Sequence, residues 1–367
     1  MKLSQFKVNI PEHLFAQYPL PYRDDSRMLV LHRKTGEIEH KGIKDIVSYF
    51  GEGDVFVFND AKVFPARLYA QKEKTMANIE IFLLRELNHE MRYWDVLVDP
   101  ARKIRIGNKL FLDEDLTIVA EVIDNTTSRG RTVRFLTDYD NSEFLDRLYE
   151  LGHTPLPKYI HRPLDEELQQ DYENLFPDYP IEEMDEERYQ TIFAEKIGAV
   201  AVPASGLHFS KQLFKRMEIS GIETHILTSY VSLGNFKRIE VDDLPKHKMD
   251  SEEIDIQQPL VDAVDRAHAA EKHICAVGTE VIRALEHVAG TIGQIKSYHG
   301  WTSKFIYPPY DFAVSDSCLV NLYPSQSIQL LCVAAFGGYD EVMNAYDEAV
   351  REGYRFGDYG DAMLIMD

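Results

Sequence analysis

Residues 203–209 (PASGLHF) combine small side chains with a histidine, where an apolar run gives way to a helical pattern. Small residues let a ligand approach the backbone closely, and the N–H groups that begin a helix attract anions. The imidazole of His208 can serve as an acid, a base or an orienting hydrogen-bond donor near neutral pH. Helix capping explains the segment equally well, because serine and glycine are common before a helix. The segment is therefore a candidate ligand site with a structural alternative of equal weight.

Residues 277–286 (VGTEVIRALE) are a second candidate, because a Gly-Thr pair begins a helix where an apolar strand ends. Ligands bind at the carboxyl ends of strands in α/β sheets. Thr279 can cap the helix, and Glu280 suits the positive end of the helix dipole. Arg283 and Glu286 are three positions apart and share a helix face. By themselves they are more simply explained as a surface ion pair.

Two further segments mix polar residues with aromatic or basic ones. The run 354–365 (YRFGDYGDAMLI) places two aspartates and two glycines among aromatic residues. Aromatic rings and carboxylates can stack on and hydrogen-bond a nucleobase, although a turn-rich tail packed on the core is an equal alternative. The run 246–252 (KHKMDSE) reads as an exposed stretch and is a weak signal.

Basic residues gather in two short stretches in the middle of the chain. They suit the phosphates of a nucleic acid, although solubilising strand faces explain each of them more simply. The histidines show no two-histidine metal spacing and the three cysteines no C-x-x-C pair, so neither a metal site nor a disulfide framework is expected. The basic residues are Arg102, Lys103, Arg105, Lys109, Arg129, Arg131 and Arg134.

The composition is that of a globular chain with a large negative charge. Its 367 residues include 40 Lys and Arg against 61 Asp and Glu, a formal net charge of −21. This charge argues against unspecific DNA coating and against binding to anionic membranes. Acids concentrate at 164–187, which we interpret as a solvated loop with room for one helical turn. The N-terminus lacks an apolar signal region and no apolar run is long enough to span a bilayer, so we expect a soluble cytoplasmic protein.

The periodicity of apolar residues predicts two kinds of structure. Six short segments with period two, between residues 67 and 138, predict a small antiparallel barrel or sandwich. After residue 189 strand-like and helical runs alternate, with strands expected at 199–203 and 305–312, and this pattern is typical of a layered α/β domain. We therefore predict an α/β fold with an inserted antiparallel β-barrel. The predicted domains are 1–66 with 141–367 (α/β, catalytic) and 67–140 (barrel).

The order of motifs along nearly the whole chain resembles the S-adenosylmethionine:tRNA ribosyltransferase-isomerase family of queuosine biosynthesis. The resemblance implies an α/β domain with an inserted barrel. The motifs are RDDSRMLVL (23–31), GDVFVFNDAKVFPARL (53–68), LGHTPLPKYI (151–160), ERYQTIFA (187–194), GAVAVPASGLHF (198–209), KHKMDSE (246–252), AVGTEVIRALE (276–286), GWTSKFIYPPYDF (300–312) and AYDEAVREGYRFGDYGDAMLI (345–365).

The resemblance also implies a reaction. S-adenosylmethionine donates its ribosyl group to the aminomethyl group of a 7-deazaguanine at the wobble position of tRNA, giving epoxyqueuosine-tRNA, adenine and methionine. The sulfonium acidifies the neighbouring 5′ carbon, a base removes a proton, adenine is expelled and the amine attacks. Such chemistry needs a base, an acid near adenine and a pocket that excludes water. No metal cofactor is expected, and the oligomeric state is left open.

Several loops depart from the family's usual pattern. Ala204 and Ser205 stand in a segment that usually reads P-T-A-G-L-H-F, and Glu280 stands in the usual G-T-T. Tyr230 and Tyr323 lie where family members usually carry histidines. Two alternative functions follow: a catalytically degenerate paralogue that binds tRNA or a nucleotide, and a related enzyme with a small nucleoside as acceptor.

On the leading hypothesis, we assign three groups of site residues. The catalytic candidates are His208, Arg283 and Glu286. The substrate-binding candidates are Asp60, Arg67, Pro203, Ser205, Gly206, Thr279 and Asp361. The tRNA-binding candidates on the barrel are Arg102, Lys103, Arg105, Arg129 and Arg131.

Overall fold

The computed structural model describes residues 1–127, 129–161, 181–231, 239–289 and 294–367. The chain divides into two compact units, which we describe separately. The α/β unit comprises Met1–Lys62, Pro157–Pro180 and Arg188–Asp367, and the barrel unit comprises Val63–Leu156 and Ile181–Glu187.

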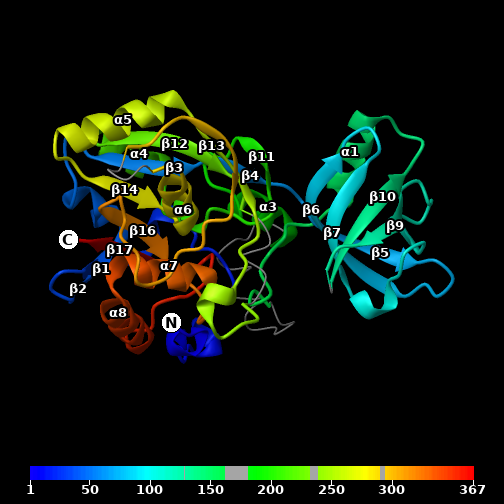
Figure 1. The fold of residues 1–367 in the computed structure, drawn as a ribbon, viewed down its shortest axis with the longest axis horizontal. Coiled ribbons are helices and arrows are strands. Elements are labelled where there is room, and N and C mark those ends of the chain that lie inside the picture. The colour runs from blue at the N-terminus through cyan, green and yellow to red at the C-terminus, as the bar shows by residue number, and fades with distance from the viewer. Residues whose placement is uncertain (128, 162–180, 232–238, 290–293) are drawn as a thin grey trace. The chain divides into compact units, whose positions relative to one another are not determined.

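A mixed sheet of nine strands, in the order β15-β13-β12-β3-β14-β16-β17-β1-β2, forms the centre of the α/β unit (Figure 1). β12, β3, β14 and β16 are neighbours and run parallel. The strands are β1 (Arg27–His32), β2 (Glu37–Gly42), β3 (Val55–Asn59), β12 (Glu223–Ser229), β13 (Glu252–Ile256), β14 (Ile274–Val277), β15 (Tyr298–Thr302), β16 (Ser317–Asn321) and β17 (Ala362–Met366). A separate pair joins β4 (Ala61–Val63) to β11 (Lys196–Ala199).

Both faces of the sheet are buried, as the continuous apolar run of β3 requires. Val55 and Val57 point into a core built with α5, α6, α7 and α8, whereas Phe56 and Phe58 point into a second core built with α4 and η4. The helices are α4 (Lys211–Ile219), α5 (Gln258–Ala269), α6 (Thr279–Val288), α7 (Ile328–Gly337) and α8 (Tyr339–Arg351), with 3₁₀ turns η1 (Leu3–Phe6), η2 (Glu12–Leu14), η3 (Arg23–Asp25), η4 (Ile43–Ser48), η6 (Ala204–His208) and η8 (Leu244–Lys246). The unit is therefore a layered α/β structure, which confirms the predicted fold class.

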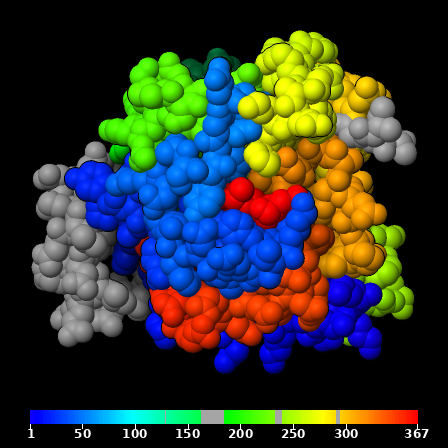
Figure 2. Space-filling model, turned by 90° about the vertical axis from the view of Figure 1, so that its left-hand side faces the viewer, coloured from blue at the N-terminus to red at the C-terminus, as the bar shows by residue number. Residues whose placement is uncertain are grey.

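The C-terminal strand lies well inside this sheet, between β16 and β1. Asp367, which follows this strand, forms ion pairs with Arg33 and Lys34, which follow β1. Figure 2, which views the molecule from the left-hand side of Figure 1, shows the C-terminal residues, in red, reaching the surface.

The barrel unit contains a closed antiparallel barrel with the strand order β10-β7-β6-β5-β8-β9. Buried and partly exposed residues alternate along β7, as period two requires for a strand with one face in a core. Helix α1 (Asn141–Leu151) follows, with Asp140 as its N-cap. The strands are β5 (Arg67–Lys72), β6 (Asn78–Asn88), β7 (Tyr93–Asp99), β8 (Lys109–Phe111), β9 (Val119–Asn125) and β10 (Gly130–Leu136); η5 (Ala101–Lys103) lies between β7 and β8. The barrel is confirmed, and the domain limits at 66/67 and 140/141 stay a prediction.

Some expected elements differ in the structure. The strand predicted at 199–203 is wrong, because β11 ends at Ala199 and the buried residues after it lead into η6. The strand predicted at 305–312 is also wrong: this proline-containing segment is irregular. The interpretation of 164–187 as a loop falls mostly outside the described residues, and its end forms part of α3 (Ile181–Arg188). Within the described ranges, no helix is both long and apolar enough to cross a membrane.

Candidate active site

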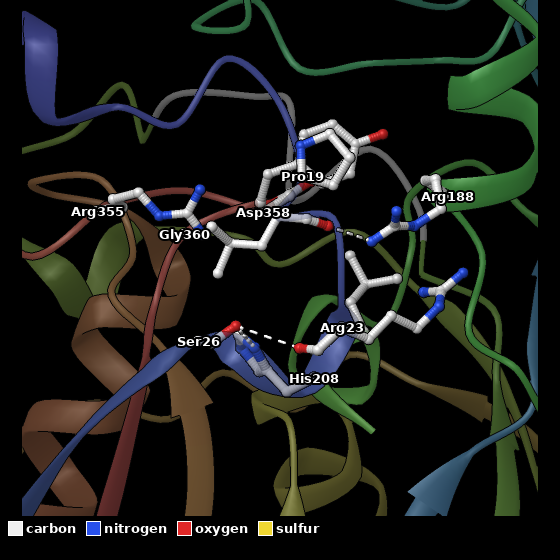
Figure 3. A pocket seen from close by; sticks show the side chains of 11 residues that line it. Pro19, Arg23, Ser26, Arg188, His208, Arg355, Asp358 and Gly360 are labelled. Carbon is white, nitrogen blue, oxygen red and sulfur yellow. Dashed lines mark hydrogen bonds between the residues drawn. The ribbon is translucent and has the colours of Figure 1, made fainter. Parts of the chain in front are cut away.

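A hollow of about 280 Å³, its open mouth included, lies in the α/β unit (Figure 3). Its walls come from four separate segments of the chain: the turn before β1, the residue that ends α3, η6, and the loop before β17. Three guanidinium groups, one imidazole and one carboxyl group line it together with apolar residues. The lining residues are Pro19, Leu20, Arg23, Ser26, Arg188, Leu207, His208, Arg355, Asp358, Tyr359 and Gly360.

His208 is held by hydrogen bonds on both ring nitrogens. Nδ1 lies 2.8 Å from Ser26 Oγ, and Nε2 lies 3.0 Å from Asn321 Oδ1. Burial lowers the pKa of His208 to about 4, although the hydrogen bond with Asn321 acts in the opposite direction. The imidazole is therefore neutral at neutral pH, and its two partners fix the plane of the ring. His208 therefore forms a fixed, uncharged part of the wall of the hollow.

Asp358 supplies the carboxyl group of the hollow. It accepts hydrogen bonds from the hydroxyls of Tyr159 at 2.7 Å and Tyr189 at 2.6 Å. Burial raises the pKa of Asp358, and the two tyrosines oppose this by stabilising the carboxylate. The loop before β17 therefore brings a buried acid to the hollow.

The three arginines give the hollow a positive side. Arg188 donates to the carbonyl oxygens of Leu20 at 2.6 Å and Pro21 at 3.2 Å. Arg355 lies 3.7 Å from the carboxylate of Asp361. Guanidinium groups favour carboxylate and phosphate ligands, because their planar donors match such oxygens in pairs.

A second polar cluster surrounds the first turn of α6. Arg283 Nη2 donates to Glu252 Oε2 at 2.5 Å, and both side chains are buried. Glu280 is 6% exposed, and its Oε1 has no hydrogen-bond partner among the described residues, nor does Arg283 Nη1. Burial raises the pKa of Glu280 to about 7. We call Ser205, Glu252, Glu280, Arg283 and Tyr323 the α6 cluster.

The α6 cluster connects to η6 through Tyr323. The hydroxyls of Tyr323 and Ser205 lie 3.3 Å apart. Burial raises the pKa of Tyr323, and so do the charges of Glu280 and Asp358. Ser205 and His208 belong to the same turn η6, so this turn borders both the α6 cluster and the hollow.

Glu286 is buried, whereas the sequence favoured a place on the surface. Its carboxylate accepts hydrogen bonds from the backbone N–H groups of Ala313 and Val314 at 3.0 Å, and from the Tyr310 hydroxyl at 3.2 Å. The predicted ion pair between Glu286 and Arg283 is wrong, because Arg283 pairs with Glu252 instead. The described contacts of Glu286 therefore hold the segment before β16.

The remaining predicted substrate-binding residues lie at several places. Thr279 begins α6, and Pro203 and Gly206 are buried in or beside η6. Asp361 accepts hydrogen bonds from the backbone N–H groups of Arg27 at 3.1 Å and Arg355 at 2.8 Å, which indicates a role in anchoring the loop before β17.

Asp60 belongs to the α/β unit and Arg67 to the barrel unit, and their role in substrate binding stays a prediction. Asp60 is buried and accepts a hydrogen bond from Thr228 Oγ1 at 2.6 Å; burial raises its pKa. Arg67 donates to the carbonyl oxygen of Leu156 at 2.7 Å.

The basic residues predicted to contact tRNA divide into two groups. Arg102, Lys103, Arg105 and Arg129 are exposed, although Arg129 also lies 3.1 Å from Asp99. Arg131 is buried, and its guanidinium donates to the carbonyl oxygens of Ala101 at 2.8 Å and Gly130 at 2.7 Å. Because its donors face backbone oxygens, Arg131 braces the barrel rather than presenting a charge at the surface.

Sequence reasoning missed several residues of these two sites. Glu252 was part of a stretch interpreted as exposed, and Glu280 was assigned only a favourable effect on the helix dipole. Arg355 and Asp358 lie in the segment 354–365 that was singled out, and Asn321 lies outside the candidate segments; each reaches its site only through the fold. No group of three or more His, Cys, Asp or Glu in the described part of the chain could hold a metal ion.

Comparison with known proteins gives matches over the full length. The family model described as "Queuosine biosynthesis protein" matches residues 3–365. The chain is 58% identical, over 367 residues and 100% of both chains, to the S-adenosylmethionine:tRNA ribosyltransferase-isomerase of Bacteroides fragilis. It is 53% identical over 366 residues, again 100% of both chains, to the protein of the same name from Flavobacterium psychrophilum.

A solved structure also matches. The crystal structure of S-adenosylmethionine tRNA ribosyltransferase from Thermotoga maritima is similar with a TM-score of 0.53 and 30% sequence identity, covering 99% of this chain and 100% of that one.

Proposed function

The chain belongs to the family of queuosine biosynthesis proteins, and from this premise we propose that it transfers and isomerises the ribosyl group of S-adenosylmethionine onto tRNA. The observation that carries the proposal is the 58% identity to a curated ribosyltransferase-isomerase over 100% of both chains. The match therefore covers both the α/β unit and the barrel unit. The enzyme is therefore a transferase and isomerase of queuosine biosynthesis that uses S-adenosylmethionine as a substrate.

The proposed acceptor is the 7-aminomethyl-7-deazaguanine at the wobble position of tRNA, and the proposed products are epoxyqueuosine-tRNA, adenine and methionine. The hollow supports the donor side of this proposal. Its arginines suit the carboxylate of the methionine moiety, and neutral His208 adds no competing charge to the wall. On this account the donor site extends from the hollow, which Leu207 and His208 line, to the backbone of residues 203–206 and to Thr279. We place the reaction in the cytoplasm and expect it to need no metal.

The proposal is tested by incubating the purified chain with S-adenosylmethionine and tRNA and measuring free adenine by chromatography. Adenine is expected with tRNA that carries the 7-aminomethyl-7-deazaguanine and not with the same tRNA carrying guanine. Excess EDTA is expected to leave the rate unchanged. Binding of the modified tRNA without adenine release would favour the non-catalytic paralogue, and release with the free nucleoside alone would favour the small-acceptor enzyme.

Contact with tRNA is assigned to the exposed basic residues Arg102, Lys103, Arg105 and Arg129 of the barrel unit. Phosphate contacts release counterions, so the logarithm of the association constant should fall linearly as the logarithm of salt concentration rises. The double variant Arg102→Ala with Arg105→Ala is expected to reduce this slope by about 2. An unchanged slope would remove these two residues from the interface.

A further inference from the structure

Glu280, in the first turn of α6, has a carboxyl group that its own backbone N–H satisfies only in part. Its side chain is almost completely buried, yet Oε1 has no hydrogen-bond partner among the described residues. A buried carboxyl oxygen without a partner is costly, since desolvation is not compensated. The nearby Nη1 of Arg283 is equally buried and also lacks a described partner. A carboxyl oxygen and a guanidinium donor without described partners in one cluster indicate a place where a ligand completes the hydrogen bonding.

The backbone of the α6 cluster is shaped around this carboxyl group. Gly278 has φ +104°, and a Cβ built on it would lie 2.7 Å from Glu280 Oε2 and closer still to Oε1. Only glycine combines this backbone conformation with such close approach of a side chain. The carboxyl group is thus folded back over the strand-to-helix turn, at the carboxyl end of β14, where ligands bind in sheets of this kind.

From this geometry we propose, on the basis of the proposed function, that Glu280, which stands where the family usually carries threonine, is in this chain the acid that protonates adenine as it leaves the donor. The C1′–N9 bond breaks and its electron pair goes to adenine, while the Glu280 O–H bond breaks and its proton goes to a ring nitrogen of adenine. The pair left at C5′ when the base removes its proton forms a C4′–C5′ double bond, the C4′–O4′ bond breaks, and its pair forms the C1′–O4′ double bond of an aldehyde as N9 leaves. Adenine leaves neutral, and Glu280 becomes a carboxylate that water reprotonates after release.

The surroundings of Glu280 suit both states of such an acid. Burial and the negative charges of Glu252 and Asp358 favour the protonated form, and the raised pKa, about 7, leaves much of it protonated at neutral pH. Once the proton has left, the backbone N–H of Glu280 itself and then the charge of Arg283 stabilise the carboxylate. Tyr323 and Cys332 also face Glu280, and burial keeps both neutral by raising their pKa values.

The test compares wild type with Glu280→Gln, which keeps the size of the side chain but cannot donate an acidic proton. The rate of adenine release at saturating substrates should fall about 10²–10⁴-fold, the usual contribution of a general acid. The affinity for S-adenosylmethionine, measured by calorimetry, and the melting temperature should change little. The matched control is Glu218→Gln on α4, whose side chain is exposed and remote from the cluster.

The pH dependence separates acid catalysis from a structural role. In wild type the rate should fall as pH rises through about 7, because Glu280 loses its proton, and in Glu280→Gln this limb should be absent. Glu280→Asp, which restores a carboxylic acid, should recover part of the rate of adenine release and part of its decline with rising pH. If Glu280→Gln fails to fold, the wild-type profile and Glu280→Asp decide.

Three results would overturn the proposal. One is turnover of folded Glu280→Gln within about twofold of wild type, another is a wild-type rate that stays flat to pH 9, and the third is an aspartate variant without the limb. In each of these cases adenine is still released by wild type, so the proposed function stands. Absence of adenine release from wild type overturns the proposed function, and this proposal with it.

Discussion

Two glutamates of the same helix, Glu280 and Glu286, have opposite surroundings. Both are buried, at 6% and 4% exposure. Glu286 accepts hydrogen bonds from two backbone N–H groups and a tyrosine, whereas one oxygen of Glu280 has no partner in the described part of the chain. The difference teaches that burial alone does not identify a reactive carboxyl group. The partners decide, because a fully bonded carboxylate has little left to offer a substrate.

The largest expected effect concerns Arg283, which lies one helical turn after Glu280 on α6 and belongs to the same cluster. Replacing it with methionine would leave Glu252 buried without its recorded ion-pair partner. Loss of one member of a buried pair costs about 3–5 kcal/mol of unfolding free energy. We therefore expect Arg283→Met to be the least stable variant discussed, as measured by urea unfolding. The double variant Arg283→Met with Glu252→Leu should recover much of the loss; if it recovers none, the ion pair is not the cause.

Glu286→Ala tests the structural side of the comparison. The N–H groups of Ala313 and Val314 would lose their acceptor, at a cost of roughly 2–4 kcal/mol. Urea unfolding should show this loss, and hydrogen exchange should be faster at residues 313 and 314. Unchanged exchange at these two amides would contradict the assigned role of Glu286.

His208 extends the comparison to a buried group with both nitrogens bonded. Its pKa, lowered from 6.5 to about 4 by burial, means that folding favours the neutral ring. The resulting stability is present above pH 6.5 and is lost as pH falls from 6.5 toward 4, by up to about 3 kcal/mol. His208→Gln should flatten this part of the stability profile, measured by urea unfolding between pH 4 and 7. An unaltered acid limb in the variant would show that another group causes it.

The fold was predictable where local periodicity decides the structure. Buried and exposed residues alternate along β7 and much of β5 and β9, and the helices and inner strands of the α/β unit are separate apolar runs. β13 was missed because its residues, EEIDI, are mostly acidic, and the burial of Glu252 depends on Arg283, which lies 31 positions further along the chain. A local pattern contains no such partner.

The site was predictable as a set of loops but not as a set of roles. The segments around Ser205, Thr279 and Asp361 were singled out because they lie beside small residues or strand ends, and the first two segments both contribute residues to the α6 cluster. Spacing by three placed Arg283 and Glu286 on one face, but it could not show that each turns to a different distant partner. Nor does sequence reveal which buried oxygen remains unbonded, since that depends on every neighbour.

The most direct measurement is tRNA-dependent adenine release by Glu280→Gln and Glu286→Gln, assayed side by side with melting temperatures. The Glu286→Gln variant keeps an oxygen acceptor for the 313–314 backbone, so its turnover should stay within about tenfold of wild type. Glu280→Gln should be about 10²–10⁴-fold slower at an almost unchanged melting temperature. The opposite result, with adenine release abolished by Glu286→Gln and retained by Glu280→Gln, would contradict this account and restore Glu286 as the catalytic glutamate of α6.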